Sequence, residues 1–233
     1  GSTDVSSIKN KRFAVNIGAK AAGRRPPWEK LAELAGGLLS DGSAEIVLLG
    51  MSEDQADAGK LIQSLPDAMR GHVVDLTGKT RLTDLPGVLA ACDVLISGDT
   101  GTLQLAAATG TKCIGLFMAG ANPVETGPYM EGAVAVVRRN TLEFSEQQQD
   151  DLRDLPIETI VELAITLVQG DEIKERVLDA NNAFAVLVAR PDHLGVSYTP
   201  LAEEDNVPLG KGKRWLPYLR FLLHRSECRV GEA

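Results

Sequence analysis

The sequence predicts an α/β domain in which a doubly wound, Rossmann-like parallel sheet is covered by helices on both faces. Short apolar runs rich in Val, Ile and Leu alternate with longer segments of helical periodicity over roughly the first 170 residues. The apolar runs are continuous, which is typical of strands that are buried on both faces of a sheet. Regular alternation of strand and helix favours βαβ units with right-handed crossovers.

Six apolar runs are predicted as strands because each is short and is bounded by Gly, Asp, Ser or charged residues. They are residues 12–17, 45–49, 73–76, 93–97, 112–117 and 133–137. Longer segments with helical periodicity are predicted as helices. They are residues 27–39, 53–65, 81–91, 102–109, 156–169 and 173–188. We expect Pro27 to fit the first turn of the first helix and Gly110 to end the helix before it.

Composition excludes several classes of protein. The 233 residues include 24 basic and 32 acidic side chains, for a net charge of −8, which argues against a general nucleic-acid binder. No run of about 18 apolar residues occurs, so no membrane-spanning helix is expected. Cys92, Cys113 and Cys228 are far apart and odd in number. We interpret the first two as reduced core thiols, and the spacing excludes a disulfide scaffold or a Cys-rich zinc site.

Three regions are expected along the chain. Residues 1–10 are interpreted as a tag or linker, since Gly1-Ser2 is typical of a remnant of cloning. Residues 11–190 are predicted to form the Rossmann-like domain. Residues 191–233, rich in Pro, Gly and charge at their start, are predicted to be a helical and irregular extension.

The loop after the first predicted strand has the composition of a phosphate site. Gly18 and Gly23 stand in a Gly-x4-Gly frame, but Arg24-Arg25 replaces the Lys-Ser/Thr pair of a nucleotide-binding P-loop, so an ATPase is not expected. Glycines, cationic side chains and a nearby helix start still suit an anion. The alternative is a surface loop with solvated arginines.

The loop after the fourth predicted strand, Ser97-Gly98-Asp99-Thr100-Gly101-Thr102, runs directly into a helix. Its small residues, hydroxyls and helix-start N–H groups would make an anion cradle. Asp99 has two interpretations: it accepts hydrogen bonds from sugar hydroxyls, or it caps the helix.

Two further loops and the histidines complete the inventory of candidate sites. The segment DLTGKT, residues 75–80, could line a base pocket with backbone groups, and GMSED, residues 50–54, offers a carboxylate for a ribose diol. His72, His193 and His224 are scattered without metal or triad spacing. The first loop also lacks the Gly-x-Gly-x-x-Gly of NAD-dependent enzymes.

Taken together, these loops resemble the nucleotide-sugar-binding half of glycosyltransferase family 9, the heptosyltransferases, which have the GT-B fold. The resemblance rests on the segment DLTGKTRLTDLPGVLAACDVLISGDTGTLQLAAATGTKCIGLF, followed by NPVETGPY. The family reads D-x-T-G-x-T-x-L, then D-T-G-x-x-H-L-A-A-A-x-G-T, then a G-P-Y turn. Its G-A-x4-K-x-W-P loop is matched by Gly18-Ala19, with Arg24 at the Lys position.

The resemblance implies a role for each loop. The residues implied at the diphosphate are Gly18, Ala19, Arg24, Thr100, Gly101 and Gln104. Those implied at the nucleoside are Glu53, Asp54, Thr77 and Gly78, and Asp99 would contact the donor sugar. The family's displacement is inverting and independent of metal, so neither a metal nor a cofactor is expected besides the nucleoside diphosphate sugar. No catalytic residue is assigned to this half.

The sequence departs from the family pattern in three ways. Gln104 stands at the family's His position, and Asp54 rather than Glu aligns with the ribose-binding carboxylate, with Glu53 offset by one. The third departure is that only one Rossmann-like half is seen, whereas GT-B enzymes carry the acceptor site and general base in an N-terminal half. We therefore expect the isolated half to be inactive and its missing partner to be that acceptor domain.

The expected function is donor binding for transfer of a heptose-like sugar from an ADP-linked donor to a cell-envelope glycan. The alternative is a non-catalytic nucleotide-sugar-binding or interaction module. The basic, leucine-rich segment that begins at Lys211 and ends at Arg225 has two interpretations, an ordinary packed tail or contact with an anionic membrane surface. The expected location is the cytoplasm, including the inner face of the membrane.

Overall fold

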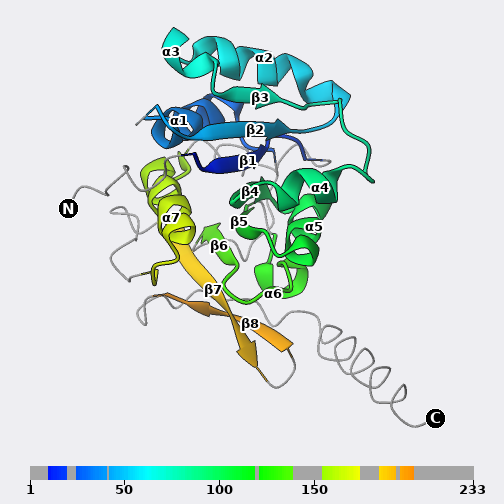
Figure 1. Cartoon of the computed structure of the whole chain (residues 1–233). Helices are drawn as coiled ribbons and strands as arrows, with labels where there is room; N and C mark the ends of the chain where they lie inside the picture. The colour runs from blue at the N-terminus through cyan, green and yellow to red at the C-terminus, as the bar shows by residue number, and fades with distance from the viewer. Residues whose placement is uncertain are drawn as a thin grey trace.

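The computed structural model describes residues 10–19, 25–40, 42–118, 121–138, 154–173, 184–192 and 195–201. They form one eight-stranded sheet with helices on both faces (Figure 1). The strands are β1 (Arg12–Asn16), β2 (Glu45–Leu49), β3 (Val73–Asp75), β4 (Val94–Gly98), β5 (Lys112–Phe117), β6 (Val134–Arg138), β7 (Phe184–Asp192) and β8 (Gly195–Pro200). Within these residues no helix is both long enough and apolar enough to cross a lipid bilayer.

The first six strands are parallel and lie in the order β3-β2-β1-β4-β5-β6, which confirms the predicted doubly wound sheet. The chain builds outward from β1 to β3 and then returns to place β4 on the other side of β1. At the end of β1, Asn16 is in register with Leu49 of β2 and with Ser97 of β4. The loops that follow these strands therefore meet at one edge, where sheets of this topology bind ligands.

The helices fall on both faces of the sheet. They are α1 (Trp28–Leu38), η3 (Ser52–Asp54), α2 (Gln55–Ser64), α3 (Asp67–Arg70), α4 (Leu85–Ala90), α5 (Gly101–Thr109), α6 (Pro123–Thr126) and α7 (Ile157–Gln169). The predicted helix over 53–65 is divided into η3 and α2, and the one over 81–91 is confined to α4. Pro27 lies at the N-cap of α1, one residue before the first turn in which it was predicted. Helix α5 ends at Gly110 in the left-handed conformation, as expected.

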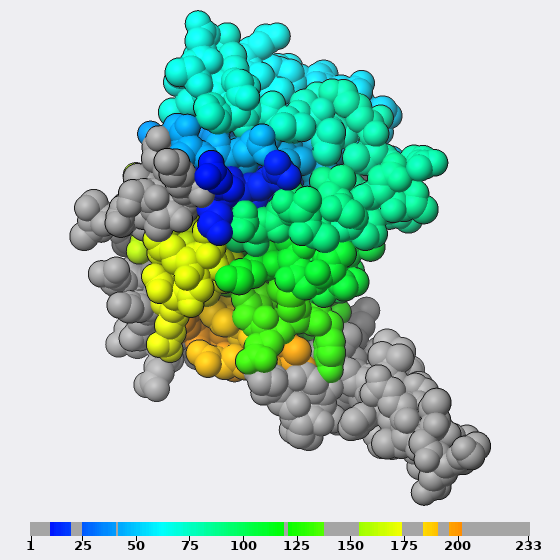
Figure 2. All heavy atoms as spheres, in the orientation of Figure 1, coloured from blue at the N-terminus to red at the C-terminus, as the bar shows by residue number. Residues whose placement is uncertain are grey.

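Strand side chains alternate between two hydrophobic cores. Phe13 and Val15 of β1 join the core beneath α1, α2 and α7, whereas Ala14 joins the core beneath α4 and α5. The same alternation runs through the other parallel strands, which explains why their sequences are apolar at nearly every position. In the space-filling view α7 and the last strands pack directly against the middle of the chain (Figure 2).

Helices α1 and α7 approach each other at a glycine. A Cβ atom added to Gly37 would lie 2.8 Å from Cγ2 of Val161, which is closer than real side chains pack. Val161 is β-branched and has little freedom to move aside. By contrast, a Cβ atom on Gly59 in α2 would meet nothing within 4 Å.

The C-terminal part of the sheet corrects two predictions. Residues 184–188, predicted as the end of a helix, belong to β7, and residues 195–200, predicted as part of an irregular extension, form β8. Short apolar runs cannot be assigned by periodicity alone. Strand pairing determines the structure of this segment, because β7 lies antiparallel to β6 and its side chains are buried in both hydrophobic cores. Residues 174–183 and 202–233, which include the basic segment 211–225, lie outside the described residues.

The hairpin of β7 and β8 holds the G-P-Y turn in place. The Tyr198 hydroxyl on β8 donates a hydrogen bond to the Pro128 carbonyl at 2.9 Å. A Cβ atom on Gly127 would overlap the Pro123 carbonyl and approach the Tyr198 ring to 2.6 Å. Glycine in this turn is therefore required by close packing against the hairpin and α6.

The two described cysteines are buried and free, as predicted. Burial raises the pKa of Cys92 to about 11 and that of Cys113 to about 12. Both are therefore thiols at neutral pH and unreactive as nucleophiles. Cys228 lies outside the described residues.

The turn after β3 is organised by one carboxylate. Asp75 Oδ1 accepts hydrogen bonds from the Thr77 N–H at 2.9 Å and from the Thr77 hydroxyl at 2.5 Å, and Lys79 Nζ lies 3.1 Å from Oδ2. Partial burial opposes ionisation of Asp75, but these hydrogen bonds outweigh it and lower its pKa. The turn is thus fixed by an ionised aspartate.

Gly37→Ala is expected to lower the free energy of unfolding by about 1–2 kcal/mol, because overpacking against Val161 exceeds the gain in helix propensity. Gly59→Ala, in open space, should instead raise stability by up to about 1 kcal/mol. Urea unfolding of both variants measures the difference. Val161→Ala should make Gly37→Ala better tolerated; equal effects of the two glycine variants would contradict the packing argument.

Asp75→Asn is expected to lower stability at pH 7 by about 1 kcal/mol, since it removes charge from a hydrogen-bonded group. The lowered pKa means that this contribution is present above the ordinary carboxyl pKa, near 4, and is lost as pH falls through the lower folded-state value. Urea unfolding from pH 7 to pH 3 should show the two proteins converging at acid pH. Asp67→Asn, at an exposed carboxylate, is the control; a constant gap for Asp75→Asn would refute the assignment.

Candidate functional site

A cavity of about 590 Å³ lies at the carboxyl ends of β1, β2 and β4. Four segments line it: the end of β1 with the loop after it, the β2 loop, the residues before α4, and the start of α5. Its lining includes Asn16, Ala19, Met51, Thr80, Leu82 and Thr102. The cavity therefore lies where the strand order reverses between β1 and β4, as the topology predicts.

Asn16 ties the floor of this cavity together. Its Nδ2 lies 3.2 Å from the Gly18 carbonyl, 3.0 Å from Ser97 Oγ and 3.2 Å from Thr100 Oγ1. The two hydroxyls are 2.9 Å apart. A buried amide is costly unless its hydrogen bonds are made, so this group fixes β1 to the loop that leads into α5.

The start of α5 has the features of an anion cradle. Thr100, not Asp99, occupies the N-cap, and the Thr100 side chain makes no capping hydrogen bond. The Thr100 hydroxyl is instead engaged by Asn16 and Ser97. Helix-start N–H groups and the helix dipole favour a negative charge, and Thr100 and Thr102 line the cavity there.

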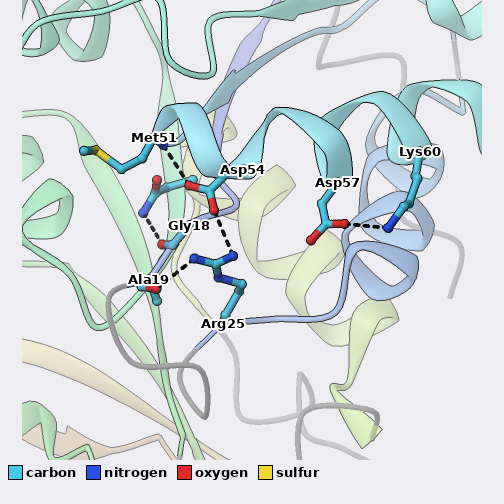
Figure 3. A network of polar contacts seen from close by, with 8 residues as sticks. Gly18, Ala19, Arg25, Met51, Asp54, Asp57 and Lys60 are labelled. Atoms are coloured by element: carbon cyan, nitrogen blue, oxygen red, sulfur yellow. Dashed lines mark hydrogen bonds and ion pairs between the residues drawn. The ribbon is translucent and has the colours of Figure 1, made fainter.

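A buried ion pair forms the wall between the first two loops (Figure 3). Asp54 Oδ1 lies 3.1 Å from Arg25 Nη1, and the Asp54 side chain is 2% exposed. Asp54 Oδ2 accepts a hydrogen bond from the Met51 N–H at 2.7 Å, and Arg25 Nη2 donates to the Ala19 carbonyl at 3.2 Å. Arg25 is one-third exposed and lines the cavity.

Two glycines make room for this carboxylate. A Cβ atom on Gly18 would overlap Asp54 Oδ2, and one on Gly50 would lie 2.9 Å from the same oxygen. Gly78 has a positive φ and packs against the Cα of Ser52, so a Cβ atom there would lie 2.8 Å away. The glycines of these three loops thus allow the strand ends to close around Asp54 and η3.

Part of the cavity lining is apolar. Met51 and Leu82 are 65% and 73% exposed, and both line the cavity together with Leu49 and Leu85. Large apolar side chains with this exposure beside a polar floor are typical of a site for a flat or apolar ligand group.

The structure places the residues proposed from sequence unevenly. Those that line the cavity are Gly18, Ala19, Glu53, Asp54 and Thr100, and Gly101 begins α5 beside them. Asp99 lies in the same loop, immediately before Thr100.

Three other proposed residues are placed outside the cavity lining. Thr77 is fully buried and its hydroxyl donates a hydrogen bond to Asp75. The Gly78 N–H donates to the Gly50 carbonyl in the β2 loop. Gln104 donates its Nε2 hydrogen to the Thr126 carbonyl at 2.8 Å. Arg24 lies outside the described residues.

Asn16 and Leu82 were not identified as site residues from sequence, and Arg25 was named only as part of the cationic loop, with Arg24 expected at the diphosphate. Asn16 interrupts the apolar residues that follow Arg12 in RFAVNI, and that signal could have found it. No local pattern distinguishes Arg25 from Arg24 or marks Leu82. Among the described residues no three His, Cys, Asp or Glu side chains gather as metal ligands.

Comparison with known proteins connects this site to a family. A lipooligosaccharide heptosyltransferase 2 of Haemophilus influenzae is 30% identical over 113 residues, which is 48% of this chain and 32% of that protein. A lipopolysaccharide heptosyltransferase 2 of Escherichia coli is 28% identical over 94 residues, 40% of this chain and 27% of that protein. The chain therefore matches about a third of the length of these relatives.

Solved structures show the same fold. The E. coli ADP-heptose LPS heptosyltransferase II superimposes with a TM-score of 0.61 at 24% identity, covering 70% of this chain and 47% of that one. A glycosyl transferase family 9 protein from Veillonella parvula gives 0.59 at 20% identity, covering 73% and 48%. The model of glycosyltransferase family 9 (heptosyltransferase) matches residues 2–153. This chain belongs to glycosyltransferase family 9, with the Rossmann-like half of a GT-B fold.

Proposed function

We propose that this chain binds a nucleoside diphosphate sugar, an ADP-linked heptose or a close analogue, as the donor half of a glycosyltransferase. The observation that carries the proposal is that Arg25 and the start of α5 face one cavity from the β1 and β4 loops. A guanidinium and the N–H groups at a helix start together suit a diphosphate. The heptosyltransferase names of the curated relatives support the choice of sugar.

The nucleoside end of the ligand is assigned to the apolar wall. Met51 and Leu82 could cover the faces of a base, whereas Glu53, which is exposed and lines the cavity, offers a carboxylate to ribose hydroxyls. Thr77 and Gly78 would act from behind, by shaping the loop. Gly18, Ala19, Thr100 and Gly101 would surround the diphosphate, with Arg24 expected beside them from the family pattern.

The chemistry follows from charge. In an inverting transfer the acceptor hydroxyl displaces the diphosphate at the anomeric carbon, so negative charge grows on the departing phosphate as the C–O bond breaks. Arg25 and the first N–H groups of α5 would stabilise that charge, which is the role preorganised donors serve best. Asp99 would hold the sugar. The acceptor, a cell-envelope glycan, and the base that takes its proton are assigned to the other half of a GT-B enzyme.

One observation favours a second candidate, a nucleotide-sugar-binding module without transferase activity. Gln104 replaces a His in the family pattern, and its amide is engaged by the Thr126 carbonyl. An amide can donate a hydrogen bond to phosphate but carries no charge. Donor binding that persists without turnover in the presence of an acceptor half would favour this candidate.

Leu82→Ser is expected to weaken ADP binding roughly three- to tenfold, because it removes apolar surface that the base would cover. Isothermal titration calorimetry of the chain with ADP, UDP and GDP measures this and the base preference. Val74→Ser is the matched control, since Val74 is also an exposed apolar side chain but does not line this cavity. Equal effects of the two substitutions, or no binding of any nucleotide to the unaltered chain, would refute the site.

Asp99→Asn is expected to weaken binding of ADP-heptose about tenfold while leaving ADP binding nearly unchanged, since the carboxylate would contact the sugar and not the ADP part of the ligand. The same calorimetric titrations with both ligands provide the comparison. A parallel loss for ADP and ADP-heptose would instead place Asp99 at the diphosphate or in the structure of the loop.

A further inference from the structure

Gln104 connects the first turn of α5 to the end of α6. Its Nε2 lies 2.8 Å from the carbonyl oxygen of Thr126, the last residue of α6. A carbonyl oxygen can only accept a hydrogen bond, so the Gln104 amide is the donor. The final carbonyl groups of a helix have no partner within that helix, and Gln104 supplies one for α6.

The turn after α6 is held by the β7–β8 hairpin. The Tyr198 hydroxyl donates a hydrogen bond to the Pro128 carbonyl at 2.9 Å, and a Cβ atom on Gly127 would lie 2.6 Å from the Tyr198 ring. Tyr198 itself is buried in the core beneath α5 and α6. Figure 1 shows α6 between α5 and β8, so these contacts form a continuous connection from the hairpin to α5.

The first turn of α5 is attached to the rest of the domain at three places. The Thr100 hydroxyl, at the N-cap, accepts a hydrogen bond from Asn16 of β1. The Leu103 side chain is fully buried over β5, 3.1 Å from where a Cβ atom of Gly115 would lie. Gln104 makes the third attachment. The first two join the turn to the sheet, whereas the third joins it to α6 and, through α6, to the hairpin.

We propose that Gln104, Thr126 and Tyr198 form a relay through which the β7–β8 hairpin holds the start of α5 in the position that receives the diphosphate. Gln104 is a positioning residue in this relay, although the sequence pattern placed it at the diphosphate itself. The inference rests on the proposed donor-binding function and deepens it. Helix-start N–H groups stabilise an anion best when they are already oriented toward it, so a shift of the first turn lowers affinity.

The relay gives the hairpin an influence on the ligand site. Strands β7 and β8 come after residues 2–153, which match the family, and no motif of the family pattern lies on them. Coupling between two sites is reciprocal, so a ligand that depends on the relay also stabilises the hairpin. Tyr198, which does not line the cavity, is therefore expected to affect the affinity for ADP.

The test is a double-substitution cycle in which ADP binding is measured by calorimetry. Tyr198→Phe removes the hydroxyl and keeps the ring, whereas Gln104→Met keeps the length and helix propensity of the side chain but removes the donor. Each substitution should weaken ADP binding about threefold, as expected for the loss of one hydrogen bond. The double variant should bind ADP about as well as either single variant, because both substitutions break the same relay.

Thr199→Val is the matched control. Thr199 follows Tyr198 in β8, and its hydroxyl also donates to a backbone carbonyl, that of Val188 at 3.3 Å, but this contact stays within the hairpin. The substitution should lower stability slightly and leave ADP affinity unchanged. Urea unfolding of each variant checks that it is folded and separates a loss of stability from a loss of affinity.

The outcomes separate this inference from the proposed function. If the unaltered chain binds no ADP, both fail. If it binds ADP but Tyr198→Phe behaves like Thr199→Val, the hairpin does not position α5, and the inference alone fails. If Gln104→Met weakens ADP equally with and without the Tyr198 hydroxyl, Gln104 acts on the phosphate directly, which also overturns the relay.

Discussion

The site depends on a geometric constraint, the parallel alignment of β2, β1 and β4 in a common register. Because Asn16 is aligned with both Leu49 and Ser97, the three loops that follow leave the sheet at one level and converge. Parallel strands send all their carboxyl ends to the same edge, so chain segments about 80 residues apart, such as Asn16 and Ser97, come into contact. The hydrogen bonds and the ion pair of the cavity form between the loops that this register brings together.

Two buried polar side chains turn the convergence into a rigid site. Asn16 binds the β1 end to the loop before α5, and Asp54 binds the β2 loop to the loop that carries Arg25. Buried amides and carboxylates are costly unless their partners are in place, so such groups favour a single arrangement of the surrounding backbone. The glycines beside Asp54 are the steric counterpart, since any side chain there would displace the carboxylate.

The β7–β8 hairpin fixes the G-P-Y turn, which is linked in turn to α5 through α6. Tyr198 fixes the turn at Pro128, and Gln104 joins α5 to the end of α6 through the Thr126 carbonyl. The hairpin is distant in sequence from the turn that it supports. The position of the G-P-Y turn is therefore a consequence of sheet pairing as much as of its own residues.

The sequence by itself determined the order of the six parallel strands and of the longer helices through residue 169, the doubly wound sheet and the edge at which the cavity-lining loops lie; the short helices α3 and α6 were not predicted. Continuous apolar runs and glycine-bounded turns are local features of the sequence, so they can be recognised without knowing which residues are in contact. The burial of Asp54 beside an exposed Glu53, the position of Arg25 at the cavity and the formation of β7 and β8 were decided only by tertiary structure. Burial and pairing are relations between distant segments, so adjacent residues of similar type, such as Glu53 and Asp54, look alike until the chain folds around one of them.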